Sequence, residues 1–138
     1  MGVLLAPEAP PAVLAARTPG ALVELARASA DLAVVATGQP SGGEVAALAT
    51  VVEVIEVDPS ASFSRLAGGP LRTARGEEGA AERRALLTRA GLVPPAWFRG
   101  SGFGEDDLLD ACAAAWTAVR RASGLAEQAE GRATTTWV

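Results

Sequence analysis

The sequence predicts an α/β protein in which a mixed central sheet is flanked by helices. From residue 18 onward, apolar runs of strand length alternate with stretches of helical periodicity. The run VVEVIEV at residues 51–57 is rich in β-branched side chains, whereas residues 104–124 repeat their apolar side chains at helical spacing. With 138 residues, the chain is long enough to form a single domain, residues 1–138, with its own core.

The first third of the chain is expected to supply three strands and one helix. Two apolar runs within residues 2–16 flank the segment PEAPP, which is typical of two strands joined by a proline-rich turn. Thr18 and Pro19 form an N-cap and N1 pair for a helix over residues 19–29. The continuous apolar run at residues 32–37 predicts a strand that is covered on both faces.

The middle of the chain predicts a strand followed by two helices. The strand at residues 51–57 carries Glu53 at its middle and Glu56 near its end. Asp58 as N-cap, Pro59 at N1 and Gly68 as the stop define a short helix over residues 59–67. A second amphipathic helix is predicted over residues 80–90, and the tail RATTTWV is β-prone and suited to an edge strand.

The helix predicted within residues 104–124 has clear signals at both ends. Acidic residues occupy its first turn, arginines occupy its last turn, and Gly124 is placed as the C′ residue. One face is broadly apolar, and a neighbouring stripe combines two carboxylates one turn apart with small residues that allow close packing. That stripe consists of Asp107, Asp110, Ala111, Ala114 and Ala118.

The composition excludes several kinds of chemistry. The chain has no histidine, so a Ser-His-Asp or Cys-His mechanism within one chain is excluded, as is a His-ligated metal. Cys112 is the single cysteine and is expected to be a buried thiol in a cytoplasmic protein. The net charge of −4 argues against a strongly basic nucleic-acid clamp, although all 12 basic residues are arginine. No apolar run is long enough to span a bilayer, so a membrane association is not expected.

Three carboxylates form the best candidate site. Glu56 lies at the end of a predicted strand, the edge of an α/β sheet where sites form, and Asp107 and Asp110 open the main helix. If they converge, they supply the oxygen ligands that Mg²⁺ or Mn²⁺ requires for phosphodiester hydrolysis. The alternative is that the aspartates complement the helix dipole, that Glu56 is a solvated charge and that Asp58 is only a cap.

Two motifs resemble a known family. EVDPSASFSRL carries Glu56, Pro59, Ser62 and Phe63 in the pattern Glu-x-x-Pro-x-x-Ser-Phe, and EDDLLDACAAAWTAVRRASG contains Asp-Asp-x-x-Asp-Ala, namely Asp106, Asp107, Asp110 and Ala111. Over about residues 51–125 the chain resembles the predicted RNase H-like nucleases, domain-of-unknown-function family four-two-nine of bacteria. The resemblance is weaker over residues 1–43. It implies a reduced RNase H-like fold and a metal site of Glu56, Asp107 and Asp110 that binds Mg or Mn.

The chain departs from this family pattern in its first part. The Gly-Val-Asp-Gly strand that supplies the expected central aspartate is missing, and Thr37 or its neighbour replaces a second acid. The chain is therefore expected to be trimmed before residue 1 and between about Gly43 and Val51. Because that first strand lies mid-sheet, either the remaining strands pair with each other or a second chain covers the gap, and we expect a homodimer for this reason.

Three functions follow from these patterns. The first is a metal-dependent nuclease-like domain, a phosphodiester hydrolase acting on a nucleic acid, in which Glu56, Asp107 and Asp110 are catalytic and the site is incomplete. The second is a non-catalytic, dimeric α/β module that retains a relict acidic cluster. The third is a small-molecule binder that uses the glycine-rich loop at residues 38–43 as an anion nest.

Overall fold

The computed structural model describes the backbone of residues 2–5, 12–14 and 34–37, and the full residues 49, 53–71, 76–95, 104–129 and 136–138. The predicted helix at residues 19–29, the loop at residues 38–43 and Trp97 lie outside the described residues. The described elements are strands β1 (Gly2–Leu5), β2 (Ala12–Leu14), β3 (Val34–Thr37) and β4 (Glu53–Glu56), and helices α3 (Pro59–Ala67), α4 (Glu77–Arg89) and α5 (Glu105–Ala122).

The strands form one sheet in the order β2-β1-β3-β4. β1 is antiparallel to both β2 and β3, whereas β3 and β4 are parallel. The register of the parallel pair aligns Thr37 with Glu56 at the carboxyl end of both strands. β1 therefore pairs directly with β3, with no strand between them. The homodimer was expected because a missing central strand would leave a gap for a second chain to cover. Since β1 and β3 pair with each other, that reason no longer applies, and the homodimer stays a prediction.

Helix α3 begins and ends where its sequence signals predict. The Asp58 carboxylate accepts hydrogen bonds from the backbone N–H groups of Ser60 (2.9 Å) and Ala61 (3.4 Å), and Pro59 occupies the first turn. Gly68 ends the helix in the left-handed conformation, at φ 73°, which a residue with a side chain rarely adopts. The short helix predicted over residues 59–67 is confirmed.

Helix α4 begins one turn earlier than predicted. It starts at Glu77 rather than at residue 80 because Glu77 and Glu78 fit the first turn, where negative charge is favourable. Gly76 precedes it with φ 121°, so this glycine acts as the boundary between loop and helix. The predicted helix is therefore confirmed, with a corrected start.

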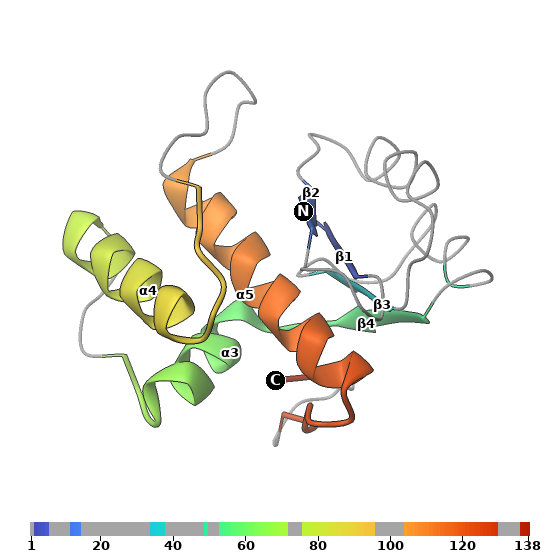
Figure 1. Ribbon diagram of the computed structural model, residues 1–138. Coiled ribbons are helices and arrows are strands. Elements are labelled where there is room, and N and C mark those ends of the chain that lie inside the picture. The colour runs from blue at the N-terminus through green and yellow to red at the C-terminus, as the bar shows by residue number, and fades with distance from the viewer. Residues whose placement is uncertain are drawn as a thin grey trace.

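Helix α5 is the centre of the described structure. It lies against β1 and β3 on one side and against α3 and α4 on the other, so it runs between the sheet and the two other helices (Figure 1). This position explains why more than one face of α5 is buried. The residues of α5 that are at most 2% exposed are Leu108, Leu109, Ala111, Cys112, Ala113, Ala114, Ala115, Thr117 and Ala118. The small-residue stripe thus serves close packing, and the helix predicted within residues 104–124 is confirmed.

The strand predicted over residues 51–57 appears as β4, Glu53–Glu56, and Val57 continues it as a single bridge to Trp137. Ile55 and Val57 are buried and join the core with Phe63 and the apolar side chains of α4 and α5. The predicted C-terminal edge strand is reduced, within the described residues, to bridges that Trp137 makes with Val57 and Gln128.

Candidate functional site

Glu56 lies at the carboxyl end of β4, where the sequence places it. Alternation along the strand puts Glu53, Ile55 and Val57 on one face and Glu56 on the other. The face of Ile55 and Val57 is the one that joins the core with α5. Glu56 is half-buried, and its backbone carbonyl accepts a hydrogen bond from the N–H of Trp137 at 2.9 Å.

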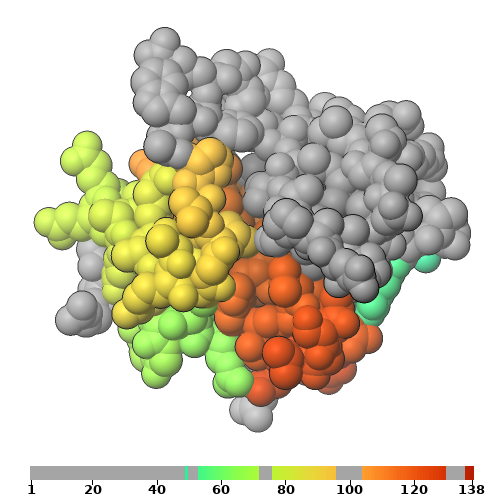
Figure 2. All heavy atoms as spheres, in the orientation of Figure 1, coloured from blue at the N-terminus to red at the C-terminus, as the bar shows by residue number. Residues whose placement is uncertain are grey.

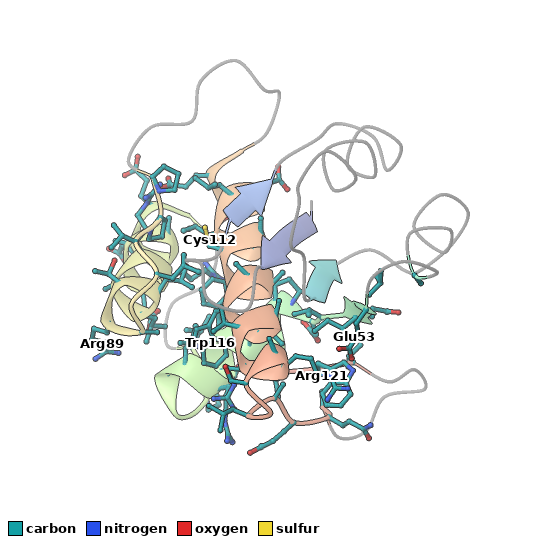
Figure 3. The ribbon with its side chains drawn as sticks, turned by 45° about the vertical axis from the view of Figure 1, so that its right-hand side comes forward. Glu53, Arg89, Cys112, Trp116 and Arg121 are labelled. Carbon is teal, nitrogen blue, oxygen red and sulfur yellow. The ribbon has the colours of Figure 1, made fainter. Side chains whose placement is uncertain are left out.

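Glu53, whose role the sequence left open, has a structural partner. Its Oε1 accepts a hydrogen bond from Nε of Arg121 at 2.8 Å, and Figure 3 shows the two side chains facing each other between β4 and the end of α5. Arg121 also stacks over the Trp137 ring, 4.3 Å from the ring centroid. Glu53 therefore anchors the C-terminal end of α5 to the first residue of β4.

The two aspartates of the candidate site occupy the first two turns of α5. Asp107 is exposed, and its Oδ2 accepts a hydrogen bond from the N–H of Gly104 at 2.9 Å, so this carboxylate closes the start of the helix. Asp110, one turn later, is half-buried and has an interaction partner of its own. The first-turn position of Asp107 agrees with the alternative to a metal ligand, in which the aspartate complements the helix dipole.

The described residues hold no group of three or more His, Cys, Asp or Glu side chains that could bind a metal ion. Glu56, Asp107 and Asp110 all lie in that described part, so the structure does not gather these three carboxylates into one such group. The role of these three carboxylates as metal ligands therefore stays a prediction, and no catalytic step through a metal is derived from this geometry.

The other residues of the first motif are structural. Ser62 and Phe63 are buried at 0% and 1% exposure. The Ser62 hydroxyl lies 2.8 Å from that of Thr117, a buried hydrogen bond that joins α3 to α5. In the Glu-x-x-Pro-x-x-Ser-Phe pattern, the glutamate ends β4, the proline begins α3 and the serine connects α3 to α5. Thr117, the partner of this serine, could not be identified from the sequence alone.

Arg84 connects three segments beside the start of α5. Its Nε donates to Glu105 Oε1 at 2.6 Å, and its Nη1 donates to the carbonyls of Pro94 (3.5 Å) and Pro95 (3.0 Å). From helical spacing alone, Glu78 and Glu82 would be the expected partners of the arginines on α4. Those pairs assume contacts along one helix, whereas Arg84 reaches across to α5 and to the loop after α4.

The other arginines of α4 differ from Arg84. The guanidinium of Arg83 lies over the Phe63 ring, 5.5 Å from its centroid, so its charge packs on the core. Arg89 is exposed and points away from the other labelled side chains (Figure 3).

Cys112 is a buried free thiol, as predicted, on the side of α5 that faces α4 (Figure 3). Burial raises the pKa of this thiol from 9.0 to about 11 because the thiolate loses its hydration, and the nearby Arg84 charge opposes the rise. At neutral pH the group is therefore protonated and has little nucleophilic character.

No described helix is long and apolar enough to cross a membrane. Neither a curated protein nor a solved structure matches the chain. A family model described as "Protein of unknown function (DUF429)" matches residues 16–135. Since this range covers most of the chain and contains both motifs, the chain belongs to the DUF429 family.

Proposed function

We propose that this chain is a nuclease-like domain of reduced RNase H-like fold in which the carboxylate site is incomplete, so that the chain alone has no metal-dependent phosphodiesterase activity. The observation that carries the proposal is the register of β3 and β4. It aligns Thr37 with Glu56 at the sheet edge where α/β folds place their sites. The resemblance implies an acid at Thr37 or its neighbour, so the strand paired with Glu56 lacks one of the expected carboxylate ligands.

The positions of the two aspartates support the same proposal. They stand in the first two turns of α5, as the family pattern implies, yet no metal-binding group of three forms among the described residues. Asp107 is engaged with the Gly104 N–H. An impaired nuclease-like domain is expected to keep its acidic residues at the family's sequence positions without bringing their carboxylates together into a metal-binding group.

The second candidate is an active enzyme that hydrolyses a nucleic acid with Mg²⁺ or Mn²⁺. It is favoured by the retained Asp106, Asp107 and Asp110, which together with Glu56 offer carboxylate oxygens of the kind that these ions prefer. In that case an ion draws the carboxylates together when it binds, and Glu56, Asp107 and Asp110 are the catalytic ligands.

A titration with Mn²⁺ separates the two candidates. Water-proton relaxation measures ion binding to the wild-type chain, to Asp107→Ala and to Asp110→Ala. We expect no saturable binding to any of the three up to about millimolar Mn²⁺, because two or three dispersed carboxylates hold an ion weakly. Saturable binding to the wild type that both variants lose would instead establish the enzyme candidate.

We also retain the homodimer as a proposal. Sedimentation velocity over a hundredfold range of concentration tests it, and a single species at the mass of one chain, 13.9 kDa, would contradict it. Nucleic-acid binding is a further proposal, and it belongs only to the second candidate, whose substrate is a nucleic acid. The net charge of −4 argues against a broad basic binding surface.

A further inference from the structure

The described residues that follow α5 fold back into two short antiparallel segments, 127–129 and 136–138, which we call the C-terminal strap. Glu127 and Val138 exchange two backbone hydrogen bonds, at 3.0 and 2.9 Å, and the Ala129 N–H donates to the Thr136 carbonyl at 2.8 Å. In Figure 2 the C-terminal part of the chain is at the surface, beside α3 and α4. The strap is therefore a local structure with its own hydrogen bonds.

The strap closes over the end of β4 that carries Glu56. The Trp137 N–H donates to the Glu56 carbonyl at 2.9 Å, and Trp137 forms a parallel bridge with Val57. Within the sheet, β4 is paired on its other side with β3. The strap thus occupies the outer edge of β4 at its last residues.

Two side chains attach the strap to the helices, and they differ in strength. Arg121 of α5 stacks on the Trp137 ring at 4.3 Å while it bonds Glu53, so one guanidinium joins α5, β4 and the strap. Arg65 of α3 forms an ion pair with Glu127 at 2.7 Å, but both side chains are about half exposed, at 47% and 58%. Water screens such a pair, so the Arg121–Trp137 stack is the stronger attachment.

The closed strap also contains a destabilising feature. Thr136 is buried at 4% exposure, and within the described residues its Oγ1 has no hydrogen-bond partner. The buried hydroxyls of Ser62 and Thr117 in the core, in contrast, bond to each other. An unpaired hydroxyl loses its hydration when the strap closes and recovers it when the strap opens, which favours the open state.

We propose that the C-terminal strap is a conformational device that opens as a unit from the Glu56 end of β4 while α3, α4 and α5 stay folded. The Arg121–Trp137 stack holds it closed, and the Thr136 hydroxyl favours opening. Opening releases the Glu56 carbonyl and the outer edge of β4 beside it. The device goes beyond the proposed function, because it operates whether or not Glu56 takes part in metal binding.

Native-state hydrogen exchange on the full chain tests the device through four strap amides, Glu127, Ala129, Trp137 and Val138, with α5 amides between Leu109 and Ala118 as reference. Trp137→Ala removes the stack and is expected to speed strap exchange about tenfold with the reference unchanged. Thr136→Val replaces the unpaired hydroxyl by a methyl group and is expected to slow strap exchange severalfold. Arg65→Gln removes only the exposed ion pair and is the control, with a change below about twofold.

Opposite shifts in the first two variants support the device. It is overturned if the strap amides exchange at the rate of the α5 amides in the wild type, because the strap then opens only by global unfolding. It is also overturned if Thr136→Val speeds strap exchange, since the hydroxyl would then be stabilising the closed state. Should Trp137→Ala fail to fold, the wild-type comparison and Thr136→Val still decide the outcome.

Discussion

The hydroxyls of Ser62 and Thr117 meet inside the core, 2.8 Å apart, and both side chains are fully buried. Ser62→Ala leaves the Thr117 hydroxyl without its partner in the core. We expect it to lower the free energy of unfolding by about 1–3 kcal/mol, the cost of an unsatisfied buried polar group. Urea unfolding measures the change.

The control for Ser62→Ala is the double variant with Thr117→Val, which removes both hydroxyls and keeps the side-chain shape at position 117. Its loss of stability should be smaller than the sum of the two single losses, because no polar group is then left unpaired. Additive losses would show that the two hydroxyls do not interact.

Because of Cys112, the free energy of unfolding is expected to fall at alkaline pH. Burial raises the pKa of its thiol from 9.0 to about 11 in the folded chain, so between these values the unfolded state loses the proton first. Stability is therefore unaffected by this group below pH 9 and falls as the pH rises from 9 to beyond 11, by roughly 3 kcal/mol in all.

This pH dependence can be assigned to one side chain. The chain has no tyrosine, and all 12 basic side chains are arginine, so no other side chain titrates between pH 9 and 11. Urea unfolding of the wild type at pH 8.5 and 10.5 should show the fall, and Cys112→Ala should not. An equal fall in both proteins would contradict the assignment to Cys112.

Sequence reasoning at the residue scale succeeded where a side chain acts on its own neighbours in the chain. The Asp58 cap and the buried Cys112 were predicted, since each follows from local pattern. The partners of Arg84 and Ser62 were not predicted, because Glu105 and Thr117 lie 21 and 55 positions away and only tertiary packing brings them near.

At the scale of elements, the alanines of α5 determine how closely the helix approaches its neighbours. Ala114 is 2% exposed on a helix that lies between the sheet and α3 and α4. Ala114→Leu adds three carbon atoms where there is no space, and we expect a loss of about 1–3 kcal/mol of stability.

Ala122→Leu is the matched control for the crowding of α5, because Ala122 is the last residue of the same helix and is exposed. Its stability should change by less than about 0.5 kcal/mol. Equal effects of the two leucines in urea unfolding would mean that α5 is not closely packed at Ala114.

The ends of elements were predicted best where the chain carries a specific signal. Proline, aspartate and glycine marked both ends of α3, and glycines marked the boundaries of α5. The start of α4 was missed by about one turn because glycines flank its first two residues, Glu77 and Glu78, although these two glutamates suit a helix start.

At the scale of the whole molecule, the pairing of strands decides how the candidate site should be interpreted. The pairing of β1 with β3 could not be predicted from the sequence, because register depends on contacts between distant segments. Strand alternation puts Glu56 on the face opposite Ile55 and Val57, but only the structure shows that the face of Ile55 and Val57 is the one that joins the core with α5. Whether Glu56, Asp107 and Asp110 lie close together therefore could not be predicted from their spacing in the sequence.

The central claim is that the carboxylate site lacks a ligand at position 37, opposite Glu56, and the most direct measurement is to supply it. Mn²⁺ binding to Thr37→Asp is followed by water-proton relaxation, with Thr37→Asn as the uncharged control and Thr37→Asp/Glu56→Gln as the control for the partner. We expect saturable binding at about millimolar Mn²⁺ in Thr37→Asp alone, because carboxylates at register-paired positions of two neighbouring strands begin a site for a divalent ion. Binding by the wild type equal to that of Thr37→Asp, or no binding by Thr37→Asp, would contradict it.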